Sequence, residues 1–263
     1  MWDESIVNNS APSQFKPAVI AAAAQLSGMI VSNKTVSYNI GWGEVGGSPT
    51  TPGTPISPGS IASTEATAFN TTYSAVRTAL IAAAKSANAL QAVSTLPGSN
   101  PLPGAPGLLA NYAQAIILGL TTAPGGAYSF CGFDSTTNWS WSGTPGAGQY
   151  DFNPVCLHEM TEALGRQLGC GVAGIWFPFD LYRYSASGTR QTGGVSASPS
   201  YFSIDSGATD LKDFYTGGGA GDPGDWAGGG GSDPFDAVGT TGVSIPLSSV
   251  DKIVIDVLGC SPQ

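Results

Sequence analysis

The residues best suited to chemistry are one histidine and two glutamates that follow it closely. His158 is the only histidine among 263 residues, and Glu159 and Glu162 come soon after it. Apolar residues at helical spacing and a stop at Gly165 or Gly169 predict a helix that begins at about residue 153. On that helix His158 and Glu162 project from one face, one turn apart, with Glu159 beside them. Such a group can hold a divalent metal and supply a general base for its water.

The spacing matches the zinc-protease pattern His-Glu-x-x-His, with Glu162 in place of the second histidine. Because the chain has no other histidine, the remaining ligands must be other donors, chiefly oxygens. That set is reasonable for zinc, and it suits manganese or calcium better than three histidines would. The alternative is an ordinary satisfied histidine, since this pentapeptide arises by chance in many helices. A glycosidase with Glu159 and Glu162 as paired carboxylates is disfavoured, because glutamates so close on one helix cannot flank a scissile bond.

Composition restricts the partners of the protein. Only 10% of the residues are charged, and the net charge of −9 makes nucleic acid and anionic membranes poor partners. The chain contains 37 glycines and 19 prolines beside 41% hydrophobic residues, which indicates a loop-rich but folded protein. Its apolar runs are too short or too interrupted for a membrane span.

Cysteines and glycosylation sequons both favour a secreted, extracellular protein. The four cysteines lack a C-x-x-C pair and predict two disulfides in one of three pairings, with one bridge anchoring a flank of the His158 helix; they are Cys131, Cys156, Cys170 and Cys260. Four Asn-x-Ser/Thr sequons, compatible with a glycoprotein, begin at Asn8, Asn33, Asn70 and Asn138. The polar start at Met1 is interpreted as a mature form whose leader was removed.

Periodicity and turn residues predict the other elements. Helices are expected over about 11–29, 64–93 (as one helix or two), 108–120 and 246–259, and strands over 34–42 and 201–205. A hairpin or paired strands are expected over 127–133 and 138–141, with linkers at 46–63 and 97–106. Ser248 or Ser249 can cap the closing helix, and Gly259 is its stop.

A Gly/Asp segment from Gly217 to Asp236 has two interpretations. It is either a flexible surface loop or a loop clamped by calcium through carboxylates and carbonyls. The carboxylates in question are Asp222, Asp225, Asp233 and Asp236.

Several segments resemble a family of secreted zincin-type metalloproteases. They are His-Glu-Met-Thr-Glu-Ala-Leu-Gly-Arg at 158–166, Phe-Asp-Leu-Tyr-Arg-Tyr-Ser at 179–185, Tyr-Phe-Ser-Ile-Asp at 201–205 and Gly-Asp-Trp-Ala at 224–227. The family has a His-Glu-x-x-Glu-x-x-Gly-Arg helix followed by an Asp-Leu-Phe/Tyr-Arg-Tyr segment, in the same order. The resemblance extends from about Tyr38 to Gly259. The chain departs from the better-known zincins at Glu162 and Leu168, which stand where those proteins have histidine ligands.

The resemblance implies one α+β domain over residues 1–263 with a zincin-like fold. An upper lobe of about 1–168 would hold an N-terminal mixed sheet, helices and the active-site helix at the cleft floor. A loop-rich C-terminal lobe would cover about 169–263. The edge strand of the upper lobe would bind an extended peptide by strand addition. Trp42 and Glu44 lie near a strand suited to this, or else pack the sheet.

The activity implied by the resemblance is peptide-bond hydrolysis by a secreted endopeptidase with one catalytic zinc ion. Calcium is a further candidate ion because of the Gly/Asp segment, and a monomer is expected. The metal would polarise the scissile carbonyl, and Glu159 would pass a proton from water to the leaving amine. The competing hypothesis is a catalytically inactive zincin-like fold that binds a protein or glycan.

The resemblance also implies further site residues. Asp180 is the candidate third metal ligand, because it follows Glu162 in the chain and lies within the shared segment 179–185. The alternative is that it pairs with Arg166 or Arg183 and orders a turn. Other possible donors, without a spacing argument, are Cys170, Glu44 and Asp205. Tyr182 or Tyr184 would donate a hydrogen bond to the developing oxyanion.

Overall fold

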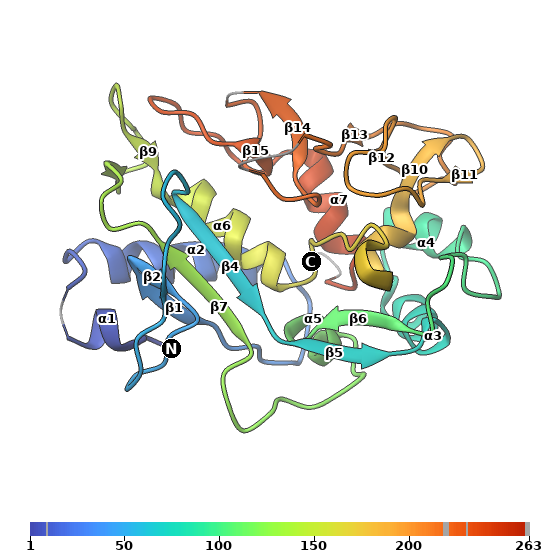
Figure 1. Cartoon of the computed structure of the whole chain (residues 1–263), viewed down its shortest axis with the longest axis horizontal. Coiled ribbons are helices and arrows are strands. Elements are labelled where there is room, and N and C mark those ends of the chain that lie inside the picture. The colour runs from blue at the N-terminus through green and yellow to red at the C-terminus, as the bar shows by residue number, and fades with distance from the viewer. Residues whose placement is uncertain (9, 218–220, 230, 261–263) are drawn as a thin grey trace.

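The sheet that lies beside the candidate helix has three strands. The computed structural model describes residues 1–8, 10–217, 221–229 and 231–260 of the chain. Within them the strand order is β1 (Asn39–Trp42), β7 (Ser129–Phe133) and β4 (Ala62–Ala66). β1 runs parallel to β7 and β4 runs antiparallel to it, so the sheet is mixed and β4 is an edge strand. The helix α6 (Phe152–Ala163) packs against β4 and β7, as Figure 1 shows.

Aromatic packing fixes the beginning of α6. The helix α2 (Phe15–Gly28) packs against α6, and its Phe15 ring lies 5.4 Å from the ring of Phe152 in an edge-on contact. Phe133 of β7 lies 4.8 Å from the same ring. Trp139 and Trp141 complete this cluster around Phe152. Such buried aromatic pairs contribute roughly 0.5–1.5 kcal/mol each beyond the area that they bury, so the first turn of α6 is held firmly.

The remaining elements are short. The other helices are α1 (Glu4–Val7), α3 (Tyr73–Ala83), α4 (Ala87–Ser94), α5 (Tyr112–Ile117) and α7 (Ser249–Val257), with single turns of 3-10 helix at η1 (Val172–Gly174) and η2 (Pro178–Tyr182). Paired strands are β2 (Glu44–Val45) with β3 (Thr54–Pro55), β5 (Ala68–Thr71) with β6 (Leu108–Asn111), β8 (Trp139–Ser140) with β9 (Tyr150–Asp151), and β14 (Trp226–Gly229) with β15 (Asp236–Val238). A second sheet has the order β11 (Thr189–Arg190), β10 (Arg183–Ala186), β12 (Tyr201–Phe202) and β13 (Lys212–Asp213).

The C-terminal half is rich in loops, as expected. Figure 1 shows β14 and β15 on the side of α6 away from α2, so this half supplies a second wall beside the helix. The α+β class predicted from the sequence is therefore confirmed. The zincin arrangement and the division into two lobes stay predictions.

Two predicted helices are partly wrong because strand pairing overrides local helical patterns. The region predicted as helix over 64–93 begins with β4 and β5, and only its later part forms α3 and α4. The region over 108–120 begins with β6, which pairs with β5, before α5 starts. The hairpin expected from 127–141 does not form either. β7 pairs with β1 and β4, whereas β8 pairs with β9.

Other element predictions are confirmed with narrower bounds. α2 falls within 11–29, and β1 and β12 occupy parts of the two predicted strands. The linker at 97–106 has neither helix nor strand, whereas the linker at 46–63 contains β3 and the start of β4. The hydroxyl of Ser248 caps α7 by accepting from Asp251 N, and Gly259 ends the helix with a φ of +102°. These signals are local, which is why the sequence reveals them.

The predicted disulfides are not formed. Cys131, Cys156, Cys170 and Cys260 are all free and buried, and all belong to the hydrophobic core. A buried thiol packs as a small apolar group, so wide spacing in the sequence gives no sign that two cysteines meet. Burial raises the pKa of Cys170 and Cys260 to about 12. Cys170 is therefore a poor source of the thiolate that a metal would need.

Exposure and hydropathy bear on the predicted location. None of the helices in the described residues is long and apolar enough to cross a lipid bilayer. The four asparagines that begin the glycosylation sequons are all exposed: Asn8, Asn33, Asn70 and Asn138. Residue 9, which belongs to the first sequon, lies outside the described residues. Glycosylation and secretion stay predictions.

Candidate functional site

The turn after α6 folds the chain back along the helix. Gly165 has a φ of +113°, and a Cβ at this position would lie 2.5 Å from Gln114, so only glycine fits. The N–H of Gly165 donates to Glu162 O at 2.8 Å, and the N–H of Arg166 donates to Thr161 O at 3.1 Å. These two bonds form a Schellman turn. The turn returns the Arg166 side chain to the helix face that carries Glu162.

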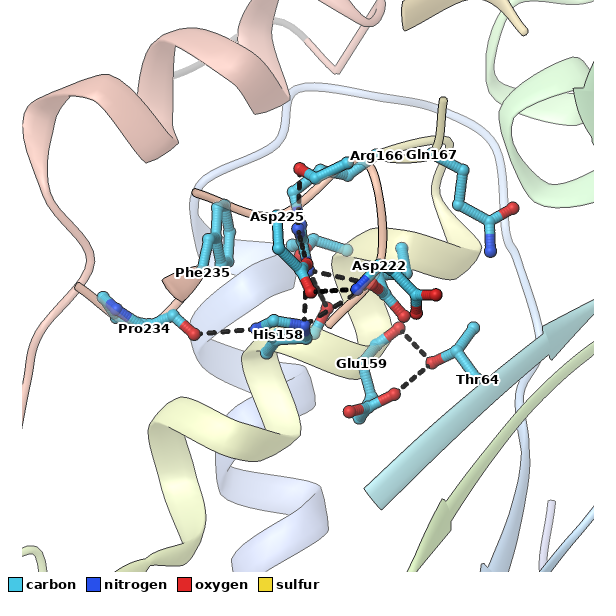
Figure 2. Close-up of polar contacts among 12 residues, drawn as sticks. Thr64, His158, Glu159, Arg166, Gln167, Asp222, Asp225, Pro234 and Phe235 are labelled. Carbon is cyan, nitrogen blue, oxygen red and sulfur yellow. Dashed lines mark hydrogen bonds and ion pairs between the residues drawn. The ribbon is translucent and has the colours of Figure 1, made fainter. Parts of the chain in front are cut away.

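His158 is oriented with one ring nitrogen toward two carboxylates. Nδ1 lies 2.8 Å from the carbonyl oxygen of Pro234, which can only accept, so Nδ1 carries a proton. Nε2 lies 3.4 Å from Glu162 Oε1 and 3.2 Å from Asp225 Oδ1. Figure 2 shows the His158 ring between Pro234 and Asp225. Metal-binding histidines are usually held in this way, by a backbone carbonyl on the nitrogen that does not bind the ion. The third residue beside His158 and Glu162 is therefore Asp225, and not Asp180.

Arg166 binds the same two carboxylates from the buried side. Its Nη1 lies 2.7 Å from Asp225 Oδ1, and its Nη2 lies 3.3 Å from Glu162 Oε1. The guanidinium also lies 4.2 Å from the centre of the Phe235 ring, so an aromatic face covers it. Arg166 thus fixes Asp225, which comes from the C-terminal half, against α6.

Glu159 is held by the edge strand of the three-stranded sheet. The hydroxyl oxygen of Thr64, on β4, lies 2.7 Å from Oε2 of Glu159 and 2.9 Å from its main-chain oxygen. The Glu159 residue is only 7% exposed. Burial, and next the nearby charge of Glu162, raise the pKa of Glu159 to about 8. A carboxylate with such a pKa is suited to accept a proton near neutral pH.

The cluster is strongly polarised without an ion. Burial and the charge of Arg166 both oppose protonation of His158, but Asp225 and Glu162 outweigh them and raise its pKa well above the usual value. Burial opposes ionisation of Asp225, yet His158 and Arg166 hold its pKa below the usual range. Burial also raises the pKa of Asp222 to about 6, with help from Glu162 and Asp225. The metal-free cluster is therefore held together by a protonated imidazole and a guanidinium.

The donor set fits a divalent metal. Zinc holds nitrogen and oxygen ligands at about 2.0–2.1 Å, so two ligand atoms of a tetrahedral site lie about 3.3 Å apart. The gaps of 3.2 and 3.4 Å from Nε2 of His158 to the two carboxylate oxygens are of this size. Ligand atoms within 4.8 Å of one another come from two groups that share Glu162: His158, Glu159 and Glu162, and Glu162, Asp222 and Asp225. Four carboxylates lie in these two groups, and a bound dication would replace the proton on Nε2 of His158 as the positive charge beside Arg166.

An open cleft of about 180 Å³ gives access to this cluster. One wall is residues 59–63, which lead into and begin β4, and another is residues 237–239 after β15 starts. Ile61 O accepts from Asp134 N, and Thr67 N donates to Tyr128 O, so main-chain groups at odd positions of this strand face β7. By the alternation of an antiparallel ladder, those of Ala62 and Thr64 face the free edge. β4 is thus the edge strand beside the cleft, whereas Trp42 lies in β1, at the opposite edge of the sheet, and packs against Phe15.

Asp180 lies outside the cluster and orders a turn. Its carboxylate accepts from three backbone N–H groups, at 2.9 Å from Gly169, 3.0 Å from Cys170 and 2.8 Å from Phe177. Neither predicted arginine is a hydrogen-bond partner: Arg166 binds Glu162 and Asp225, and Arg183 binds Ser200 Oγ and backbone carbonyls. The prediction that Asp180 is the third ligand is therefore wrong, because its oxygens are already used by the backbone.

The predicted oxyanion donors also lie elsewhere. Tyr182 and Tyr184 are fully buried and do not line the cleft. Their hydroxyl groups have no hydrogen-bond partner in the described residues, and Tyr184 packs its ring against Arg190. Burial raises the pKa of Tyr182. Neither residue can reach a substrate in the cleft.

The Gly/Asp segment does not form one calcium clamp within the described residues. Asp222 and Asp225 join the His158 cluster. Asp233 instead pairs with Lys212 at 2.7 Å, and Asp236 accepts from Ser232 Oγ at 2.9 Å. Residues 218–220 and 230 of this segment lie outside the described residues.

Three residues of the site escaped prediction from the sequence. Thr64 stood in a predicted helix, Pro234 stood in the predicted loop, and Arg166 was considered only as one of two alternative partners of Asp180, beside Arg183. Arg166 alone had a usable signal, because it directly follows the glycine that ends the helix.

Comparisons with known proteins do not identify a family for this chain, so the function is argued from the geometry of the site. No protein-family model matches the chain, and searches of the curated proteins and of the solved structures return no match.

Proposed function

We propose that this protein is a zincin-type metallopeptidase, secreted from the cell, that hydrolyses peptide bonds in the cleft beside α6. The observation that carries the proposal is the set of donors around Nε2 of His158, with Glu162 at 3.4 Å and Asp225 at 3.2 Å. His158, Glu162 and Asp225 would hold a divalent ion, zinc by the size of these gaps, and Asp222 stands next to them. When bound, the ion supplies Lewis-acid activation of a water molecule and of the scissile carbonyl.

The residues of the chain divide the remaining work. Glu159 takes the proton from the attacking water, keeps it in a buried site that favours the protonated carboxyl, and delivers it to the leaving amine. Thr64 holds the Glu159 carboxylate toward the cleft. Pro234 O fixes the tautomer of His158, and Arg166 keeps Asp225 in place.

The peptide class of the substrate is supported by the free edge of β4. Main-chain groups of Ala62 and Thr64 face away from β7, and an extended peptide can pair with such an edge through backbone bonds. Thr64 therefore contacts the peptide through its main chain and Glu159 through its side chain. This arrangement would place a peptide bond next to the general base.

The proposal is tested by metal content and hydrolysis together. Protein purified without added metal and then supplied with zinc should bind one ion and cleave an unstructured protein such as casein; a chelator should stop cleavage. Glu159→Gln should keep the ion and lose about 10²- to 10⁴-fold in turnover, since an amide cannot accept the proton. Glu4→Gln, in the first helix, is the matched control and should behave as wild type. Zinc-loaded protein that cleaves no peptide bond would refute the proposal.

A second candidate is a metal-free fold that binds a partner in the cleft. It is favoured by the pairing of Arg166 with both carboxylates, which gives the cluster counter-charge without an ion. Elemental analysis separates the two candidates. Failure to bind zinc, manganese or calcium at micromolar concentration would favour the second.

A further inference from the structure

A narrow slot lies next to the candidate cleft, one helical turn before His158. It has a volume of about 40 Å³ and shares Tyr150, Val155 and Val238 with the cleft. Val155 precedes His158 by three residues on α6, so both side chains are on the same face of the helix. The slot therefore borders the space beside the ligand set, with Val155 in the wall of both.

The walls of the slot are mainly apolar. Its side chains include Tyr150, Pro154, Val155, Val238, Val243 and Ile245. Each of the three carboxylates at its wall has a partner within the protein: Asp151 with Ser244, Asp233 with Lys212, and Asp236, through Oδ2, with Ser232. The other oxygen of Asp236, Oδ1, has no hydrogen-bond partner in the described residues but is itself buried, so the surface left for a ligand is mainly aliphatic and aromatic.

The volume sets the size of the group that enters. One water needs about 10–15 Å³ of such volume, so a slot of about 40 Å³ has room for roughly three waters. An aliphatic side chain of three or four carbons occupies a similar space. A benzyl group is too large for it, and a methyl group would leave most of it empty.

We propose that this slot receives one side chain of the bound peptide and selects Val, Ile or Leu beside the bond that is cleaved. The inference rests on the proposed function, because it names the substrate of that same cleft. Val155 is the residue to vary, since its side chain lines both the slot and the cleft. Hydrophobic pockets discriminate by about 10- to 200-fold for each added or missing methylene, so the preference is measurable.

The first experiment measures binding without turnover. Zinc-loaded Glu159→Gln protein is titrated with short peptides that differ at one central residue: Gly, Ala, Val, Leu, Phe or Lys. The peptides with Val or Leu should bind at least about tenfold more tightly than those with Gly, Phe or Lys at the same position. Equal binding of all six, or tightest binding of Lys or Phe, would overturn the proposal.

The second experiment changes the size of the slot. Val155→Ala should shift the preference toward Phe by about tenfold or more. Val93→Ala is the matched control, because Val93 is also half-buried in a helix but does not line the slot. An unchanged order of affinities in Val155→Ala protein of wild-type thermal stability would also overturn the proposal.

The two proposals fail in different ways. If the wild-type protein hydrolyses none of the peptides yet Glu159→Gln prefers Val and Leu, the hydrolytic function fails and the slot stands. If the wild type cleaves them all at similar rates and binding shows no preference, the function stands and the slot fails.

Discussion

The hydroxyl oxygen of Thr64 lies 2.7 Å from Oε2 of Glu159, although 95 residues separate the two in the chain. Thr64 is on the edge strand β4, which is proposed to bind the substrate, and Glu159 on α6 is the proposed base. This contact therefore connects the substrate-binding strand with the base. A hydroxyl that donates to a carboxylate stabilises the ionised form. Thr64 is therefore a positioning residue that also makes Glu159 a stronger acid.

Replacing this hydroxyl should disturb the base more than the fold. In Thr64→Val we expect kcat to fall by about tenfold at neutral pH with little change in KM, because the carboxylate loses its orientation. The acid limb of the pH profile should move to higher pH, since the pKa of Glu159 rises without its donor. Thr64→Ser keeps the hydroxyl and should restore both values. A pH profile that does not move would show that Thr64 only packs the strand.

Asp225 should be required for the metal. We expect Asp225→Asn to lower zinc affinity by at least about 10- to 100-fold, the range that even outer-sphere losses cause, because the charged oxygen at 3.2 Å from His158 is removed. Competition with a fluorescent zinc indicator measures this affinity. Asp205→Asn is the control, since Asp205 binds Ser203 and Thr209 outside the cluster. An affinity equal to that of the wild type would exclude Asp225 from the ligand set.

Asp180 should matter for stability and not for metal. Asp180→Ala leaves three backbone N–H groups without their acceptor, and each buried unsatisfied group costs roughly 1–3 kcal/mol. We expect a lower midpoint in urea unfolding, followed by fluorescence of the tryptophans. Zinc affinity at a temperature where the variant is folded should stay within about twofold of wild type, whereas a residue that binds the ion would change it far more.

The metal-free protein should lose stability as the pH rises. The pKa of Glu159 is about 8 in the folded protein, chiefly through burial, against a usual value of 4.5. The folded state therefore holds a proton that the unfolded state has released between these two values, so unfolding becomes easier as pH increases from about 5 to 8. Urea unfolding in the presence of a chelator, at pH 5, 6.5 and 8, measures the slope. Glu159→Gln should flatten it, and an equally steep slope in that variant would assign the effect to other groups.

The His158 helix could be predicted from the sequence because its signals are local. Helical periodicity places His158 and Glu162 on one face, and Gly165 ends the helix. The distances of 3.4 and 3.2 Å from Nε2 of His158 to Glu162 and Asp225 depend also on the tertiary structure, because Asp225 comes from a segment far from α6 in the chain. Pro234 and Asp225 come from loops with no periodicity, so nothing in their neighbourhood indicates that they face His158.

The sequence by itself determined the His158 helix and the cap of the closing helix, since backbone bonds within a few residues decide both, and the α+β class followed from the family resemblance. Only the tertiary structure decided that β4 is a strand, that Asp225 replaces Asp180 beside the metal candidates, and that the cysteines stay unpaired. Strand pairing and buried ion pairs join residues far apart in the chain, and their free energy depends on burial that no local pattern records.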